Sequence, residues 1–123
     1  MRLPKVLPCL AIAAFAPCLL SCKKETHVDA SKPLEQSFQT SEPEAKQALA
    51  TATTSLKAGN YIEAGRALDP LLAGHKLTPQ QRQAVGLMFQ QINQAIAANP
   101  NLESKELYDL RVRLAHAARG DQF

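Results

Sequence analysis

The sequence predicts an all-α protein: a small antiparallel bundle or set of hairpins of about four helices, preceded by a flexible segment. Three observations predict this class. From residue 43 to residue 120, apolar residues recur at spacings of three and four, the period of an amphipathic helix. No stretch there alternates apolar and polar residues as a half-buried strand does. Glycine, proline and capping residues divide the region into four segments whose short connections favour antiparallel neighbours.

The first 21 residues have the layout of an export signal. Arg2 and Lys5 supply a positive start, and an apolar run follows over residues 6–20. A membrane-spanning helix needs about 20 consecutive apolar residues, and Pro17 would interrupt one. We therefore expect residues 1–21 to be a cleaved signal peptide.

The run Leu19-Leu20-Ser21-Cys22 closes this apolar stretch and is followed by two lysines. It resembles the lipobox of bacterial lipoproteins, in which leucine, a tolerant position and a small residue precede a cysteine. The resemblance implies that Cys22 carries a diacylglycerol, that cleavage occurs directly before it, and that its new amine is acylated, for example with palmitate. The thiolate is the strongest side-chain nucleophile at neutral pH, which suits this alkylation. An ordinary secretory signal with a free thiol at position 22 is the alternative.

This resemblance also implies a location. One acyl chain binds a bilayer only reversibly, whereas two or three on one residue hold a protein there. Lys23 follows the cysteine, where an aspartate would imply retention in the inner membrane under the sorting rule of enteric bacteria. The expected location is therefore the bacterial cell envelope, with the chain lipid-anchored to the outer membrane and facing the periplasm.

Residues 22–42 are predicted to form a lipidated, flexible tether. They are rich in charged and small polar residues, and their large apolar residues are few: Val28, Leu34 and Phe38. Such a composition buries too little apolar surface to offset the entropy lost on ordering.

The charge balance and the cysteine content of the expected mature chain argue against a nucleic-acid partner and against an internal disulfide. The chain has 14 basic and 11 acidic side chains, but Arg2 and Lys5 would leave with the signal, so the mature charges nearly balance. A nucleic-acid partner is therefore not expected, since it would require a basic stripe with stacking aromatics. Cys9 and Cys18 would also leave, and Cys22 carries lipid, so no disulfide can form within one mature chain.

The predicted helical domain covers residues 43–120. Its first helix, about 43–58, has Ser41 as the expected N-cap and Gly59 as its stop. The second helix covers about 61–73. It contains Pro70, which lacks a backbone N–H, so we expect a kink or break near Leu68. The predicted inward-facing residues of these two helices are Ala45, Ala48, Leu49, Ala52, Leu56, Tyr61, Ala64, Leu68, Leu71 and Leu72.

The third helix has the clearest start, because Thr78, Pro79 and Gln81 form a capping box with proline at the first position. Asn99-Pro100-Asn101 closes it. The fourth helix covers about 104–119 and ends at Gly120. The predicted inward-facing residues of these two helices are Val85, Met88, Phe89, Ile92, Ala95, Ile96, Leu107, Leu110, Leu114 and Ala117 or Ala118.

The stretch Gly59-Asn60-Tyr61-Ile62-Glu63-Ala64 joins the first two helices. It resembles the turn between the two helices of a tetratricopeptide unit, which reads glycine, any residue, tyrosine, two residues, alanine. The resemblance implies packing roles: Gly59 permits the turn, Tyr61 fills the hairpin mouth, and Ala64 lets the helices approach. Only one such unit occurs, whereas a stable groove needs about three. A generic helical hairpin accounts for the same residues.

No catalytic, cofactor-binding or metal-binding constellation is predicted. His27, His75 and His116 are not spaced with other ligands as zinc sites require, and His116 is expected at a helix end. The glutamine-rich runs at 80–83 and 90–91 are interpreted as solvated faces. We therefore expect a protein that is not an enzyme and has no cofactor and no small-molecule substrate.

These patterns favour a membrane-anchored envelope lipoprotein whose small helical domain mediates protein–protein contacts. The alternative is a structural envelope lipoprotein that self-associates or contacts the cell wall. Against the alternative, Gly59, Gly74 and Pro100 interrupt the helices, unlike the single long heptad helix of the major murein lipoprotein.

Overall fold

The computed structural model describes residues 27–39, 42–73 and 76–121, and every regular element in these ranges is helical. The predicted all-α class is therefore confirmed. The predicted signal peptide and Cys22 lie outside the described residues. The elements are α1 (Ser31–Ser37), α2 (Pro43–Lys57), α3 (Tyr61–Leu72), α4 (Pro79–Ala98), the short 3-10 helix η1 (Pro100–Leu102) and α5 (Lys105–Arg119).

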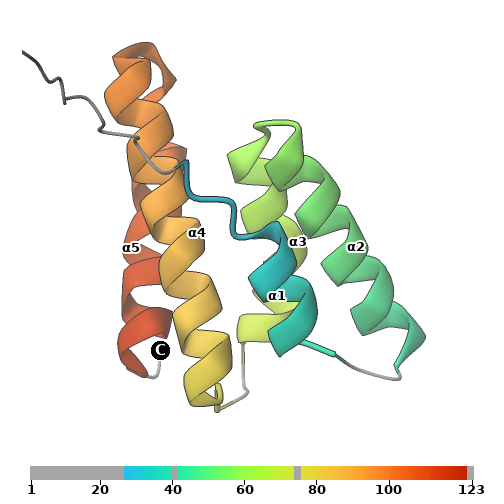
Figure 1. Cartoon of the computed structure of the whole chain (residues 1–123). Helices are drawn as coiled ribbons and strands as arrows, with labels where there is room; N and C mark the ends of the chain where they lie inside the picture. The colour runs from blue at the N-terminus through green and yellow to red at the C-terminus, as the bar shows by residue number, and fades with distance from the viewer. Residues whose placement is uncertain (1–26, 40–41, 74–75, 122–123) are drawn as a thin grey trace, which may run out of the picture.

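Two antiparallel hairpins, α2–α3 and α4–α5, form the two halves of the domain (Figure 1). The halves meet in two places. Helix α3 packs against α5, and α1 lies between α2 and α4 and contacts both. The first helix thus joins the two hairpins on one side of the domain.

Helix α2 ends as predicted, in a turn that depends on glycine. Gly59 has a φ of +83°, a conformation that L side chains rarely adopt. Its N–H donates to the carbonyl oxygen of Leu56 at 3.1 Å, and the N–H of Asn60 donates to that of Ser55 at 2.8 Å. This pair of bonds is a Schellman motif, and it satisfies carbonyls that the helix leaves unpaired.

The start of α2 differs from the prediction. Glu42 occupies the N-cap position without a side-chain cap bond, and Pro43 is the first helical residue. The predicted cap, Ser41, lies outside the described residues. Proline supplies its own start signal, because its fixed φ suits the first turn and its missing N–H would have been unpaired there.

Helix α3 continues through Pro70 to Leu72, so the predicted break near Leu68 is wrong. Pro70 cannot donate a hydrogen bond to the carbonyl oxygen of Arg66, but only two helical residues follow it, so the loss is confined to the last turn. The N–H of Ala73 still donates to the carbonyl oxygen of Asp69 at 2.9 Å. The helix therefore tolerates proline two residues before its end.

The predicted capping box of α4 is confirmed. The hydroxyl of Thr78 accepts from the N–H of Gln81 at 3.1 Å, and the Gln81 side chain accepts from the N–H of Thr78 at 2.9 Å. Helix α5 begins after Ser104, whose hydroxyl accepts from the N–H of Leu107 at 3.1 Å. It ends at Gly120, which has a φ of +83°.

The core consists of small and aliphatic side chains from all five α-helices and includes most of the predicted inward-facing residues. Gly65 permits the approach of α3 to α5, since a Cβ there would lie 2.3 Å from Cδ1 of the buried Leu110. The largest fully buried hydrophobic side chains are Leu34, Leu56, Leu68, Met88, Ile92, Leu114 and Val85.

Leu34 belongs to a segment that the sequence assigned to the tether. The prediction of a flexible tether over 22–42 is wrong for residues 28–38, which are docked and partly helical. Ala30, Leu34 and Phe38 follow one another at intervals of four and are 0%, 0% and 5% exposed. The prediction was based on composition, because three large apolar residues are too few to form a core by themselves. In the structure these residues are buried because α1 packs against α2 and α4.

Candidate functional site

Glutamine side chains of α4 bind the main chain of the N-terminal segment. The Oε1 of Gln91 accepts from the N–H of Ala30 at 2.9 Å, and that of Gln94 accepts from the N–H of Val28 at 3.0 Å. Further along, Nε2 of Gln81 donates to the carbonyl oxygen of Ser37 at 3.1 Å. These bonds hold the segment at both ends of α1.

The structure corrects the prediction that the glutamine runs are only solvated faces. Gln91 is 7% exposed, whereas its neighbour Gln90 is exposed. The signal was present in the spacing: Gln91 lies three residues after Met88 and beside Ile92, on the apolar face of α4. A buried amide needs hydrogen-bond partners, and the main chain of residues 28–30 supplies one.

A local turn precedes α1. The carboxylate of Asp29 accepts from the N–H of Ser31 at 3.0 Å. This bond lowers the pKa of Asp29, and the nearby Lys57 acts in the same direction. Ala30 itself provides no side-chain cap, so the start of α1 depends on Asp29 and on the glutamines of α4.

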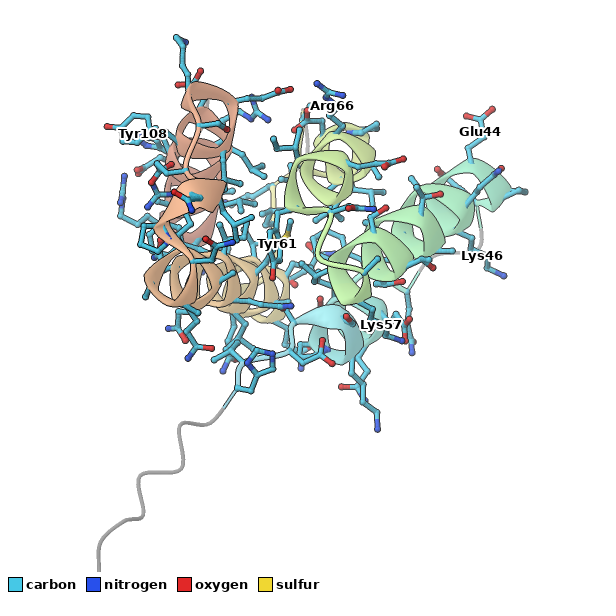
Figure 2. All side chains as sticks on the ribbon, turned by 90° about the horizontal axis from the view of Figure 1, so that it is seen from above. Glu44, Lys46, Lys57, Tyr61, Arg66 and Tyr108 are labelled. Atoms are coloured by element: carbon cyan, nitrogen blue, oxygen red, sulfur yellow. The ribbon has the colours of Figure 1, made fainter. Side chains whose placement is uncertain are left out.

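A second feature is a set of exposed apolar side chains, Leu102 of η1 and Tyr108 and Val112 of α5; the two on α5 are called the α5 face. Within the described ranges, these are the large hydrophobic residues that remain exposed, at 39%, 56% and 38%. Leu102 ends η1, and Tyr108 and Val112 lie one helical turn apart on α5. Figure 2 shows the Tyr108 side chain projecting from the edge of the molecule, away from α2 and α3. The guanidinium of Arg111 lies 5.7 Å from the centre of its ring.

The charged groups around the α5 face are paired with one another. Lys105 binds Asp109 at 2.9 Å, and this partner raises the pKa of Lys105. Three carboxylates on α5 or directly before it therefore have basic partners. The other pairs are Arg111 with Glu103 and Arg66 with Glu106.

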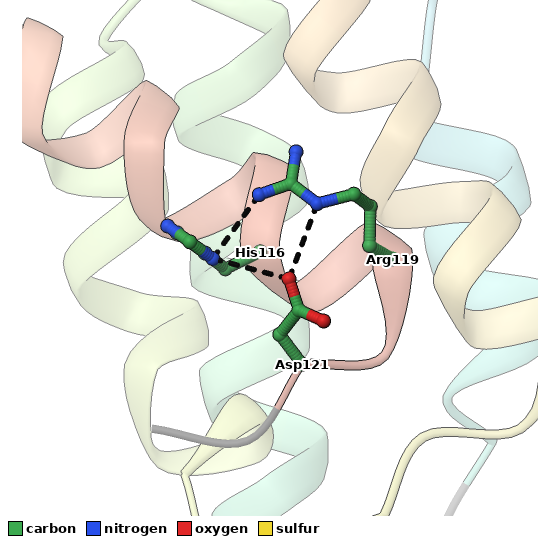
Figure 3. A network of polar contacts seen from close by, with 3 residues as sticks. All are labelled: His116, Arg119 and Asp121. Carbon is green, nitrogen blue, oxygen red and sulfur yellow. Dashed lines mark hydrogen bonds and ion pairs between the residues drawn. The ribbon is translucent and has the colours of Figure 1, made fainter.

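The end of α5 carries a three-residue polar network (Figure 3). Oδ2 of Asp121 lies 3.1 Å from Nε of Arg119 and 3.2 Å from Nδ1 of His116, and these partners, Arg119 first, lower the pKa of Asp121. Nη2 of Arg119 is also 3.1 Å from Nδ1 of His116. That nitrogen can donate to Asp121 or accept from Arg119, but not both. The network folds the chain over the helix end, and His116 lies at a helix end as predicted.

The residues of the predicted tetratricopeptide-like turn have packing positions. Ala64 is fully buried on α3, and Gly59 forms the turn described above. Tyr61 is half-buried at the first position of α3, and its side chain points inward in Figure 2. These positions occur in a generic helical hairpin as well.

The described residues contain no group of three or more His, Cys, Asp or Glu side chains placed to hold a metal ion. Among the helices of the described ranges, none is long and apolar enough to cross a membrane. Comparison with protein-family models, curated proteins and solved structures found no match for this chain. The protein has the fold of a small helical domain, in which an N-terminal segment docks on two helical hairpins.

Proposed function

We propose that this protein is a membrane-anchored envelope lipoprotein whose helical domain contacts another protein. The run Leu19-Leu20-Ser21-Cys22 carries the proposal, because it stands at the end of an apolar segment and before Lys23-Lys24. In this proposal Cys22 bears the lipid, which contributes about 0.8 kcal/mol per buried methylene group.

The α5 face supports the protein-contact part of the proposal. An aromatic residue with an aliphatic residue one helical turn away, flanked by charged groups, matches the usual anatomy of a contact surface: an apolar centre and a polar rim. Tyrosine adds contact area at little entropic cost, because it has few rotatable bonds. The paired charges at the rim favour a protein surface over a strongly charged partner.

The anchor is tested by mass spectrometry of the protein purified from a bacterial host, together with labelling by a clickable palmitate. We expect a mature chain that begins at lipidated Cys22 and incorporates the label. The Cys22→Ser chain is the control and should remain unlabelled. A free thiol at position 22, or residues still attached ahead of it, would contradict the anchor.

The contact surface is tested with a photo-crosslinking amino acid at position 108, compared with the same probe at Glu44, an exposed position on the other hairpin. We expect one discrete crosslinked protein from position 108 and none from position 44. Val112→Lys should remove that product while the fold, monitored by circular dichroism, is retained. A product containing two copies of this chain would support the self-associating alternative, and equal labelling from both sites would refute the α5 face.

A further inference from the structure

We infer that residues 28–38 form a releasable latch, whose docking decides how far the folded domain lies from the bilayer and which end of the domain is attached. The membrane part of this inference rests on the proposed lipid at Cys22. The latch itself rests only on contacts within the described residues.

The latch has little stability of its own. Helix α1 has seven residues and no side-chain cap at its N-cap position, and a helix of that length is unstable in water by itself. Its docked form depends on the three glutamines of α4 and on the burial of Ala30, Leu34 and Phe38.

The rest of the domain does not depend on the latch in the same way. The hairpins α2–α3 and α4–α5 are each closed by extensive contacts between their own helices, and α3 packs on α5 directly. Segments at the end of a fold open at a lower free energy than its central helices, and α1 is the first of the described helices. Release of residues 28–38 can therefore precede unfolding of the hairpins.

The two states attach the domain at different ends. When the latch is docked, Val28 is fixed beside Gln94 in the last turns of α4. When it is released, the first folded residue is Pro43, at the start of α2. Figure 1 shows these two points at opposite ends of the domain: the upper end of α4 and the lower end of α2. The domain would therefore be attached to the bilayer through the end near Gln94 when the latch is docked, and through the start of α2 when it is released.

The reach of the anchor changes as well. From Cys22 to Val28 the chain makes six steps, which extend to about 20 Å at most. From Cys22 to Pro43 it makes 21 steps, which extend to about 70 Å. A docked latch thus holds the domain against the membrane, and a released latch lets it extend toward a partner at a distance.

Hydrogen exchange tests the latch, using the mature chain with Cys22→Ser so that no lipid is required. Gln91→Ala removes the bond to the N–H of Ala30, and Gln90→Ala, at the exposed neighbouring position, is the matched control. We expect exchange in residues 28–38 to rise about tenfold in Gln91→Ala, the equivalent of one buried hydrogen bond. Residues 105–119 should exchange at an unchanged rate, and Gln90→Ala should match the wild type.

The wild type provides an independent check if Gln91→Ala fails to fold. Residues 28–38 should exchange faster than residues 105–119 in the unaltered sequence. Equal rates for both segments in the wild type would refute a separable latch, as would a parallel rise of both in Gln91→Ala.

Energy transfer to a bilayer acceptor tests the attachment. The lipidated protein is placed in vesicles with a donor on Ala98→Cys, at the end of α4, or on Glu44→Cys, near the start of α2; both positions are exposed. With Cys22 acylated, the introduced cysteine is the only free thiol of the mature chain. Transfer should be greater from position 98 than from position 44, and Gln91→Ala should abolish or reverse that order.

The outcomes separate the two proposals. Failure of the protein to bind vesicles at all would refute the lipid anchor and leave the exchange result standing. The protein could instead bind vesicles, and Gln91→Ala could speed exchange in residues 28–38 without changing which position transfers more energy. That result would refute only the proposed change in the end of the domain that is attached to the bilayer.

Discussion

Helices α4 and α1 pack against each other, yet their stability has different origins. Helix α4 has 20 residues, a complete capping box and proline at its first position. Helix α1 has seven residues and is held by side chains 44 to 66 positions away in the sequence. The comparison shows that one domain can combine a helix specified by its neighbours in the chain with a helix specified by its neighbours in space.

This difference predicts how destabilising substitutions in the two helices affect the stability of the domain. If a helix unfolds only together with the rest of the domain, a substitution in it lowers the free energy of global unfolding by its full cost. If a helix can detach before the domain unfolds, a substitution in it can lower stability by no more than the free energy of its docking.

The largest effect is expected from truncating a core leucine. Leu114 on α5 and Leu34 on α1 are both 0% exposed, so they form a matched pair. Leu114→Ala should lower the free energy of unfolding by about 2–5 kcal/mol, because a cavity replaces the side chain. Leu34→Ala should cost less, because α1 can be released before the hairpins unfold. Urea denaturation measures both, and equal costs would show that α1 is a full member of the cooperative core.

The next effect concerns the contact between the two hairpins. Gly65→Ala would place a Cβ 2.3 Å from Cδ1 of Leu110, and overpacking of this kind costs about 1–3 kcal/mol. Gly86→Ala meets only Cβ of Ala118, at 3.7 Å, and should raise stability by about 0.5–1 kcal/mol through helix propensity. Thermal unfolding of the two variants should shift in opposite directions. A stabilised Gly65→Ala would mean that α3 and α5 are less tightly packed than described.

A smaller effect is expected at the start of α4. Thr78→Ala removes the hydroxyl that accepts from the N–H of Gln81 and should lower the free energy of unfolding by about 1 kcal/mol. Thr51→Ala, at an exposed position inside α2, is the control and should leave stability unchanged or slightly higher. Denaturation in urea compares them. A Thr78→Ala chain as stable as wild type would show that Pro79 alone is sufficient to start the helix.

The smallest effect is a loss of latch docking in acid. The pKa of Asp29 is lowered in the folded chain, mainly by the N–H of Ser31. Its stabilising contribution is therefore complete above the unfolded pKa of about 3.9 and is lost as the pH falls through the lowered folded value. Exchange of residues 28–38 should accelerate in that range more than the intrinsic acid rate predicts, and Asp29→Asn should remove this pH dependence. An identical acid profile in wild type and Asp29→Asn would contradict the role of the carboxylate.

Much of the domain was determined by the sequence itself. The all-α class, the start of α4 at Thr78 and the glycine stops at positions 59 and 120 were predicted from local patterns, and the structure confirms them. Helix periodicity, capping boxes and Schellman turns join residues at most five apart, so their signals are legible in a short window. The lipobox-like run before Cys22 is a local pattern too, and it stays a prediction.

The docking of residues 28–38 and the hydrogen bond of Gln91 to Ala30 depend on contacts between distant parts of the chain. The composition of residues 28–38 indicated a tether, and the glutamine run was interpreted as a solvated face. The spacing of Gln91 to Met88 and Ile92 indicated a buried side chain, but its partner could not be predicted, because the docking bonds join residues 44 to 66 positions apart and no local window contains both partners. A short segment with three apolar residues cannot offset the entropy of ordering alone, but it is ordered here because α2 and α4 supply the surface against which it is buried and α4 supplies its hydrogen-bond partners.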